Sequence, residues 1–359
     1  MIKHFLPVCL LSLLCGELHA APQSLYLAAG EKISVYTISP ETGELTPSDG
    51  VDLAGVGPFT FSADGSKMYA SASVKGDNRI ATLERAGNGA LEVIDSAPVT
   101  VNAGYLDLDK TGNYLAANSY QDGTVSVWKL EDGVFRGELV QELALEQHAH
   151  GANFSPDNRW LLVPATSPNK VFVQAFDENT GEIVPNKPAF GQGPKGEKEA
   201  RNPRHLIFHP AKNDIAYTTN EKYEPGVCVW KWNGTDGTLT PIQNIVTIPE
   251  EFSAAGSTAT LRLTPDHRFL YVSNRRRDGK SSIAAFRVDS ESGRLQLISH
   301  TPCENMPRSF CIDRTGSFIY VAGREDGFLG VYKIDQNSGA LTKVTQYEVG
   351  KGTRWVEAR

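Results

Sequence analysis

Apolar and polar residues along most of the chain form short runs separated by polar turns. Examples of the runs are 125–128 (VSVW), 227–230 (VCVW), 283–286 (IAAF) and 330–332 (GVY). Alternation with a period of two residues is typical of half-buried β-strands. Glycine-containing turns such as 42–45 (TGEL) and 338–341 (SGAL) connect such runs, and glycine meets the positive φ of a tight hairpin turn. The pattern predicts an all-β chain built from hairpins.

One frame, made of an apolar strand, a polar turn and a second apolar strand, recurs six times. Its first strands are anchored at Phe61, Leu108, Phe154, Phe208, Leu263 and Ile312. Successive anchors are 47, 46, 54, 55 and 49 residues apart. This spacing matches the four-stranded blade of a β-propeller and is too long for other solenoid repeats.

The two ends of the chain complete each other. The chain opens in the middle of a blade, at 25–28 (LYLA) and 33–36 (ISVY), and closes on a single strand of the innermost type, 354–358 (RWVEA). Pairing these ends would complete a seventh blade and leave no exposed sheet edge. We predict one domain over residues 21–359, an all-β, seven-bladed β-propeller closed by pairing the C-terminal strand with the N-terminal strands. The irregular stretch 190–202 is predicted to be a surface loop near a channel mouth.

The first twenty residues have the pattern of a secretory signal peptide. Lys3 precedes an apolar run over 5–15, and Ala20 ends a plausible cleavage site. The run is too short to span a bilayer, and no later segment approaches the required length. We predict a signal peptide over 1–20, an exported mature protein that is periplasmic or secreted, and no membrane span.

Composition narrows the class of partner. Of 359 residues, 40% are hydrophobic and 21% charged, which supports a globular chain with a sizeable core. The formal net charge is −7, and it is unchanged when residues 1–20 are removed because they carry one Lys and one Glu. Nucleic-acid binding is carried by clustered Lys and Arg, so nucleic acid is excluded as the main partner. The oligomeric state stays open.

The cysteines do not indicate a metal site. Cys228, Cys303 and Cys311 remain after the signal peptide, without CxxC or His-rich spacing. A Cys303–Cys311 disulfide and a pair of thiols remain as alternatives. The chain has neither a GxSxG elbow nor a metal triad, and we predict no metal and no cofactor.

Superposing the repeats shows which positions differ between blades. Four residues before the first-strand anchor, the blades carry Gly57, Gly104, His150, Arg204, Ala259, Arg308 and, in the closing strand, Arg354. Four residues after the second-strand apolar residue, they carry Gly30, Ser73, Ser119, Thr166, Glu221, Arg275 and Arg324. Both positions lie at the same kind of strand end, so the ring is predicted to gather them at one mouth of the central channel. Charge at a position that other blades leave small and neutral is not required by the scaffold.

A histidine and a carboxylate among arginines suit acid/base chemistry on an anionic substrate, because arginine binds carboxylate or phosphate through two parallel hydrogen bonds. Propeller channels also carry charged side chains simply because they are wet, and a single arginine there is usually solvated. The residues predicted to be catalytic are His150 and Glu221. Those predicted to bind substrate are Arg204, Arg275, Arg308, Arg324, Arg354 and Asn153. Packing roles are predicted for Trp128, Trp230 and Trp232, and ordinary structural roles for His205 and His209.

At these positions the sequence resembles a known family. The segments 148–157 (HAHGANFSPD), 202–210 (NPRHLIFHP), 217–221 (YTTNE) and 263–275 (LTPDHRFLYVSNR) are similar to those of the seven-bladed propeller lactonases. That family includes bacterial 6-phosphogluconolactonases and fungal carboxy-cis,cis-muconate cyclases. The resemblance covers essentially the whole mature chain. From the cyclases it implies a site of His150, Glu221, Arg204 and Arg275. The familiar phosphogluconolactonases are cytoplasmic, whereas this chain carries an export signal.

The resemblance implies a lactonase that opens a small lactone bearing a carboxylate or phosphate, and the predicted signal peptide implies that it is exported. A carboxymuconate cyclase, which closes a lactone on a muconate-like substrate, is the alternative within the family. A non-catalytic ligand-binding or scaffold propeller is the alternative from another class, because the fold hosts many functions.

Overall fold

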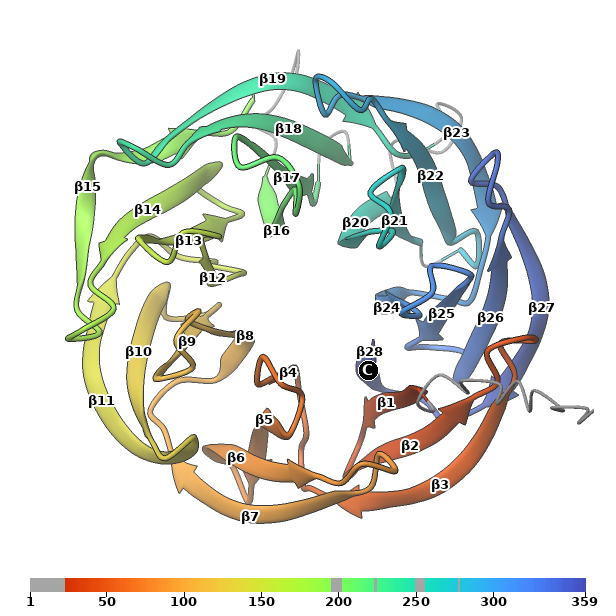
Figure 1. Cartoon of the computed structure of the whole chain (residues 1–359), viewed down its shortest axis with the longest axis horizontal. Helices are drawn as coiled ribbons and strands as arrows, with labels where there is room; N and C mark the ends of the chain where they lie inside the picture. The colour runs from red at the N-terminus through yellow and green to blue at the C-terminus, as the bar shows by residue number, and fades with distance from the viewer. Residues whose placement is uncertain (1–22, 195–201, 223–224, 249–255, 277) are drawn as a thin grey trace, which may run out of the picture.

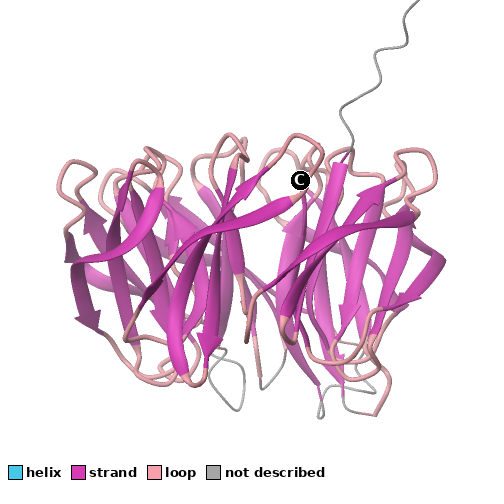
Figure 2. Cartoon of the chain, turned by 90° about the horizontal axis from the view of Figure 1, so that it is seen from below, coloured by secondary structure: helices cyan, strands magenta, loops and turns pink. Residues whose placement is uncertain are grey.

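The computed structural model describes residues 23–194, 202–222, 225–248, 256–276 and 278–359. These residues form seven four-stranded antiparallel sheets arranged as a ring (Figure 1). In the view turned by 90°, the strands run between two faces, each edged by loops (Figure 2). The predicted all-β, seven-bladed propeller is confirmed.

Each blade contributes one strand to each of four concentric layers. The innermost strands are β4 (Phe59–Phe61), β8 (Ala103–Leu108), β12 (Asn153–Phe154), β16 (Pro203–Phe208), β20 (Gly256–Leu263), β24 (Pro307–Ile312) and β28 (Thr353–Ala358). The second strands are β1 (Gln23–Ala29), β5 (Lys67–Val74), β9 (Tyr114–Ser119), β13 (Trp160–Ala165), β17 (Ile215–Asn220), β21 (Phe269–Arg276) and β25 (Phe318–Gly323).

The two outer layers are longer on average and more exposed. The third strands are β2 (Lys32–Ile38), β6 (Asp77–Arg85), β10 (Thr124–Glu131), β14 (Lys170–Phe176), β18 (Gly226–Asn233), β22 (Ser282–Val288) and β26 (Phe328–Ile334). The outermost strands are β3 (Leu45–Asp52), β7 (Leu91–Pro98), β11 (Val134–Ala144), β15 (Ile183–Gln192), β19 (Thr238–Val246), β23 (Leu295–Pro302) and β27 (Leu341–Glu348).

The two ends of the chain share one blade, as predicted. Its strand order is β28-β1-β2-β3, and Leu27 pairs with Val356 in the antiparallel register of β1 and β28. The chain end, marked in Figure 1, lies beside the centre of the ring. Pairing the last strand with the first therefore closes the ring and covers the edge of β1.

The apolar core lies between the faces of neighbouring blades. One cluster joins Leu25 and Leu27 on β1 to Phe318 and Leu329 on the preceding blade, and all four side chains are fully or almost fully buried. Because no blade can bury its faces alone, the ring is held together by contacts between neighbours.

A fully or partly buried polar contact also joins each blade to the next. An aromatic side chain on the second strand of a blade donates a hydrogen bond to a backbone carbonyl in the hairpin turn between the third and fourth strands of the following blade. The pairs are Tyr26–Gly89, Tyr69–Gly133, Tyr114–Asn179, Trp160–Gly234, Tyr217–Gly293, Tyr271–Gly339 and Tyr320–Gly43, with donor–acceptor distances of 2.8, 2.7, 3.0, 2.9, 2.8, 2.9 and 3.0 Å. The donor is Tyr in six blades and the Trp160 indole in the remaining one, so the contact follows the repeat.

Near one face, the innermost strands depart from regular pairing. On β16, Pro203 pairs with Asn220 and Leu206 with Thr218, so three steps on β16 match two on β17. Similar irregularities occur on β8, β20, β24 and β28 at the corresponding height. A β-bulge of this kind turns neighbouring side chains toward the same side of a strand. At the strand ends where charged residues were predicted, the side chains therefore do not simply alternate between the two sides of the strand.

Several smaller predictions can be compared with the structure. Trp128, Trp230 and Trp232 are buried, as expected for packing residues. Cys303 and Cys311 are both thiols, so the disulfide alternative is wrong. The predicted signal peptide lies outside the described residues, as does 195–201 of the predicted 190–202 loop, and β15 continues to Gln192. Across the described ranges, no helix has the length and apolarity needed to cross a membrane.

We predict that Tyr271→Phe destabilises the ring although it removes only one hydroxyl group. The Gly339 carbonyl then loses a buried hydrogen bond, which costs about 1–2 kcal/mol. Urea unfolding should show a lower midpoint. The matched change Tyr36→Phe, at a half-buried residue whose hydroxyl is hydrogen-bonded to Ser34 of the same strand, should alter stability less, because it removes no contact between blades. Equal midpoints for both variants would contradict a stabilising role of the contact between blades.

Candidate active site

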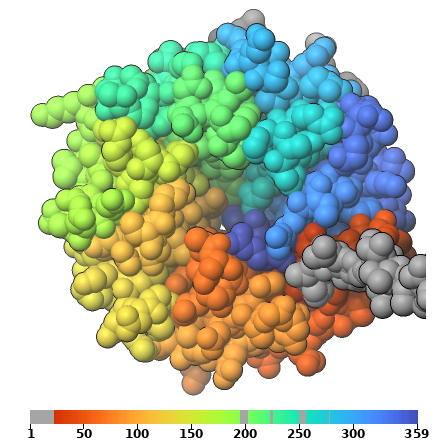
Figure 3. Space-filling view, viewed as in Figure 1, coloured from red at the N-terminus to blue at the C-terminus, as the bar shows by residue number. Residues whose placement is uncertain are grey.

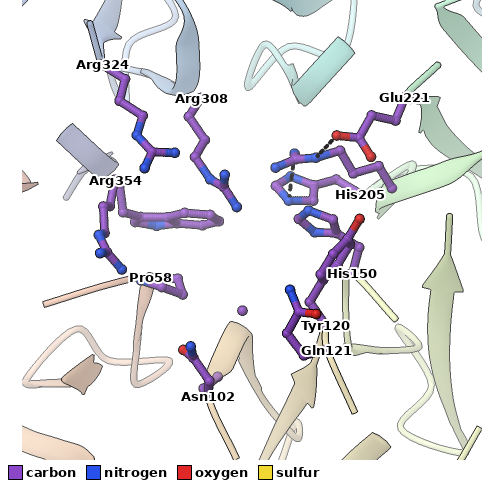
Figure 4. A pocket seen from close by; sticks show the side chains of 14 residues that line it. Pro58, Asn102, Tyr120, Gln121, His150, His205, Glu221, Arg308, Arg324 and Arg354 are labelled. Atoms are coloured by element: carbon purple, nitrogen blue, oxygen red, sulfur yellow. Dashed lines mark hydrogen bonds and ion pairs between the residues drawn. The ribbon is translucent and has the colours of Figure 1, made fainter. Parts of the chain in front are cut away.

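One mouth of the central channel holds a cavity of about 400 Å³, within the usual size range of small-molecule sites. Its wall carries a histidine and a glutamate on one side and three arginines on the other (Figure 4). The lining residues are Pro58, Asn102, Ala103, Gly104, Tyr120, Gln121, His150, Arg204, His205, Glu221, Arg308, Arg324, Arg354 and Trp355. Figure 3 shows the opposite face of the ring, which is also hollowed at its centre.

Glu221 holds two arginines together. Its Oε1 accepts a hydrogen bond of 2.6 Å from Nη2 of Arg275, and the same atom lies 3.7 Å from Nε of Arg204. The side chains of Glu221, Arg275 and Arg204 are 11%, 10% and 1% exposed. Burial opposes ionisation of Glu221, but the two guanidinium groups outweigh it and hold the pKa of the carboxyl below its usual value of 4.5. Glu221 is therefore an ionised partner of both arginines at neutral pH.

His150 lies just before β12 and is 5% exposed. Burial, followed by the charges of Arg204 and Arg308, lowers the pKa of its imidazole well below the usual 6.5. Its Nδ1 is buried without a hydrogen-bond partner among the described residues. The ring packs edge-on against Tyr120, with 5.1 Å between centroids. At neutral pH, His150 therefore presents an uncharged imidazole in the cavity wall, which is the form that can accept a proton.

His205 fixes the position of Arg204. Nη1 of Arg204 donates to the carbonyl of Ala259 at 2.6 Å and lies 3.0 Å from Nε2 of His205. Because a guanidinium group can only donate, Nε2 accepts, and the proton of His205 lies on Nδ1, which donates to Oγ1 of Thr260 at 3.2 Å. Burial and the neighbouring Arg204 lower the pKa of His205 well below its usual value, consistent with this neutral tautomer.

Three rings from distant blades meet across the channel beneath the mouth. The His205 ring centroid is 5.4 Å from that of Tyr105 and 6.0 Å from that of Trp355, and Tyr105 and Trp355 are 5.7 Å apart. These residues come from β16, β8 and β28. Two of them, His205 and Trp355, line the cavity, so they form part of its inner end.

The remaining arginines lie on the opposite wall (Figure 4). Arg308 on β24 is half-buried, whereas Arg324, just after β25, and Arg354 on β28 are exposed. Burial, with the charges of Arg275 and Arg324, lowers the pKa of Arg308 to about 10, so it remains charged at neutral pH. Within the described ranges, none of these three guanidinium groups has a hydrogen bond or an ion pair to another residue.

Six of the eight residues predicted for the site line this cavity: His150, Arg204, Glu221, Arg308, Arg324 and Arg354. Arg275 is not part of the lining and reaches the site through Glu221. Asn153 lies outside the lining as well, and its Nδ2 donates to the Tyr105 hydroxyl at 3.2 Å. The structure thus brings the charged residues of the two predicted columns to one mouth and leaves Asn153 outside the lining, bonded to Tyr105.

His205 and Trp355 line the cavity although neither was predicted for the site. His205 was predicted to be structural, like His209, whose Nδ1 does accept a turn hydrogen bond from the Ala211 amide. Regular alternation would turn neighbouring residues to opposite sides of the strand, but the bulge lets Arg204 and His205 both face the cavity. A signal did exist. The column that follows the first candidate position carries Pro58, Tyr105, Gly151, His205, Thr260, Ser309 and Trp355, and its three large rings are the ones that meet.

Among the described residues, no group of three or more His, Cys, Asp or Glu side chains lies close enough together to hold a metal ion.

The ring and its charged mouth define a β-propeller enzyme with a small-molecule site on the channel axis. A family model described as "Lactonase, 7-bladed beta-propeller" matches residues 20–358, and the chain belongs to that family. It is 33% identical over 338 residues to a 6-phosphogluconolactonase of Cronobacter sakazakii, covering 93% of this chain and 97% of the relative. It is 31% identical over 342 residues to a 6-phosphogluconolactonase of Yersinia pestis, covering 94% and 98%.

The chain is also similar to a solved lactonase structure. The periplasmic gluconolactonase of Pseudomonas aeruginosa is 26% identical, with a TM-score of 0.84 over 93% of this chain and 98% of that one. The lactonase family predicted from the sequence is thus confirmed.

Glu221→Gln is predicted to destabilise the protein by about 3 kcal/mol, because it leaves the buried Arg204 and Arg275 without their counter-charge. The folded-state pKa of Glu221 lies below its unfolded value near 4.5. Its contribution is therefore fully present above pH 4.5 and is lost as pH falls through the folded-state pKa. Unfolding midpoints measured from pH 7 to pH 3 should converge for the variant and the parent. Glu92→Gln, at an exposed residue of β7, is the matched control and should resemble the parent throughout.

Proposed function

We propose that the protein is an exported lactonase that hydrolyses a small lactone bearing a negatively charged group. The observation that carries the proposal is the uncharged His150 imidazole in a cavity wall that also holds arginines fixed by Glu221. The names of the relatives, 6-phosphogluconolactonase and gluconolactonase, support hydrolysis of a sugar lactone over closure of one.

In the proposed reaction, His150 removes a proton from water as the water oxygen attacks the lactone carbonyl carbon. The carbonyl oxygen becomes negatively charged, and Arg204 in the cavity lining stabilises that charge, while Arg275 acts through Glu221. When the intermediate collapses, the bond between the carbonyl carbon and the ring oxygen breaks. The imidazolium of His150 then returns its proton to the leaving oxygen, and the product is the open hydroxy acid.

Glu221 is assigned a different role from the histidine. A general base acts best when its pKa is near the working pH, and the two arginines hold the pKa of Glu221 below 4.5. One of its two oxygens, Oε1, already accepts a hydrogen bond from Arg275. Glu221 therefore positions the arginines so that the carbonyl oxygen meets donors that need no rearrangement.

His150→Gln tests the general base. We expect kcat on glucono-δ-lactone and its 6-phosphate to fall about 10²–10⁴-fold with little change in KM. His267→Asn, in the β20–β21 turn at the other end of the strands, should retain parental activity. Equal rates for His150→Gln and the parent, after spontaneous hydrolysis is subtracted, would rule out the proposed reaction.

The pH profile gives a second test. His150 must be neutral to act, and its pKa lies below 6.5. We therefore expect kcat/KM to stay level as pH falls from 8 to 6.5 and to decline only below that range. A decline centred above pH 6.5 would contradict the role of this histidine.

Export is part of the proposal. The apolar run of residues 5–15 behind Lys3 supports it, as does the likeness to a periplasmic gluconolactonase. Expression of the full chain in a Gram-negative host should yield a periplasmic protein whose mass corresponds to a chain beginning at Ala21. An intact N-terminus in the cytoplasmic fraction would contradict it.

A further inference from the structure

A chain of four hydrogen bonds runs from Arg204 to residues outside the active-site cavity. Nη1 of Arg204 donates to Nε2 of His205 at 3.0 Å, and Nδ1 of His205 donates to Oγ1 of Thr260 at 3.2 Å. The same Oγ1 accepts from Nη1 of Arg262 at 3.3 Å, and Nη2 of Arg262 donates to Oε2 of Glu357 at 2.9 Å. Arg204 and His205 line the cavity, whereas the other three residues do not.

The outer end of this chain lies in a second cavity. Arg262 and Glu357 line a space of about 250 Å³ together with residues such as Pro210, His267 and Arg314. These three come from the turns that follow β16, β20 and β24, at the end of the inner strands away from the active site. The side chains of Arg262 and Glu357 are 18% and 32% exposed. Substitutions here therefore alter the hydrogen-bond chain without altering the surface that lines the active site.

The two arginines fix the direction of the hydrogen bonds between them. A guanidinium group can only donate, so Arg204 requires a lone pair on Nε2 of His205. A neutral imidazole has one proton, which then lies on Nδ1 and needs an acceptor. Oγ1 of Thr260 has two lone pairs, and it uses them for Arg262 and for His205. The chain thus favours the His205 tautomer that accepts from Arg204.

The His205 ring is also held by packing. It is 3% exposed, and its centroid lies 5.4 Å from that of Tyr105 and 6.0 Å from that of Trp355. Cζ of Arg262 lies 5.8 Å from the centroid of the Trp355 ring. Arg262 therefore contacts two of the groups that hold His205, the Thr260 hydroxyl and the Trp355 indole.

The ring fold does not require the outer pair. Arg262 and Glu357 occupy equivalent positions of β20 and β28, and four of the other five blades have an uncharged residue there. The residues of those five blades are Thr60, Asp107, Asn153, Ile207 and Cys311. An ion pair of partly buried side chains adds little net stability, because desolvation offsets the attraction. A role in placing His205 accounts for charges that stability alone does not explain.

We propose that Thr260, Arg262 and Glu357 are positioning residues of the reaction. They fix the His205 tautomer that accepts from Arg204, and so hold this guanidinium group where the oxyanion of the lactone forms. The proposal rests on the proposed function, which gives Arg204 that task. An oxyanion donor is effective when it is placed before the reaction begins, and a misplacement of about 1 Å can cost about 100-fold in rate.

Thr260→Val and Thr260→Ser separate the hydroxyl from the rest of the side chain. Valine keeps the shape but removes the acceptor of His205, so kcat on glucono-δ-lactone should fall about 10–100-fold. KM should change little, because Arg204 acts on charge that develops in the transition state. Serine keeps the hydroxyl and should restore a kcat close to that of the parent.

Thr82→Val is the matched control. The Thr82 hydroxyl is fully buried and accepts a hydrogen bond of 2.9 Å from the Phe135 amide of another blade. Its loss should lower the melting temperature, as Thr260→Val does, but leave the kcat of the folded enzyme unchanged. A parental kcat in folded Thr260→Val would show that Thr260 only stabilises the fold, and it would overturn the proposal.

Arg262→Met and Glu357→Gln test the outer end of the chain. Each should give a kcat between those of the parent and Thr260→Val. Adding either change to Thr260→Val should lower kcat no further, because all three residues act through the one imidazole of His205. Losses that simply multiply, or a parental kcat in both single variants, would exclude Arg262 and Glu357 from the positioning role.

Nitrogen NMR of protein labelled with ¹⁵N-histidine reads the tautomer without turnover. The His205 signals, assigned by their absence in His205→Asn, should show a protonated Nδ1 in the parent and a smaller protonated fraction at Nδ1 in Thr260→Val. An unchanged tautomer, or a changed tautomer with parental kcat, would overturn the proposal. A parent that hydrolyses no lactone would reject the proposed function instead, and the tautomer would still show whether Thr260 orients His205.

Discussion

Closure of the ring is the constraint on which the rest of the structure depends. Each blade buries its faces only against its two neighbours, and in each a buried Tyr hydroxyl, or the Trp160 indole, hydrogen-bonds to a turn of the next blade. The last of these contacts joins Tyr320 to Gly43 across the point where the chain begins and ends. Together with the β1–β28 pairing, this contact gives every blade a neighbour on both sides. A buried carbonyl that loses its donor costs more than the average hydrogen bond contributes, so the contacts specify the spacing of the blades as well as adding stability.

Most of the fold could be predicted because its information is local and repeated. The anchors from Phe61 to Ile312 recur at blade-length intervals, and the incomplete ends can only be completed by each other. The predicted mouth followed from the same repeat, since the columns of His150 and Glu221 occupy equivalent strand ends. The roles within the site could not be obtained in this way. That Arg275 and Arg204 share one oxygen of Glu221 depends on how neighbouring blades meet, and the entry of His205 into the cavity depends on a bulge that alternation does not encode.

The buried charges divide the cavity into two environments. Glu221 neutralises part of the charge of Arg204 and Arg275 and makes them rigid, which suits a group that must stabilise a developing oxyanion without moving. Arg308, Arg324 and Arg354 have no such carboxylate among the described residues, and Arg324 and Arg354 are exposed. Burial, followed by the charges of Arg204 and Arg308, lowers the pKa of His150, so part of the positive charge in the cavity wall also keeps the imidazole in its basic form. The protein as a whole carries −7, so this positive charge is local to the channel mouth.

Closure and chemistry are linked through the last strand. β28 completes the first blade, and it also carries Trp355, whose ring meets His205 and Tyr105 beneath the mouth, and Arg354 in the cationic wall. His205 in turn holds Nη1 of Arg204. An open ring would therefore lack part of the arginine-rich wall and the Trp355 ring that packs against His205, even if the other six blades were formed. The site exists only in the closed propeller, because the residues that complete it arrive with the strand that closes it.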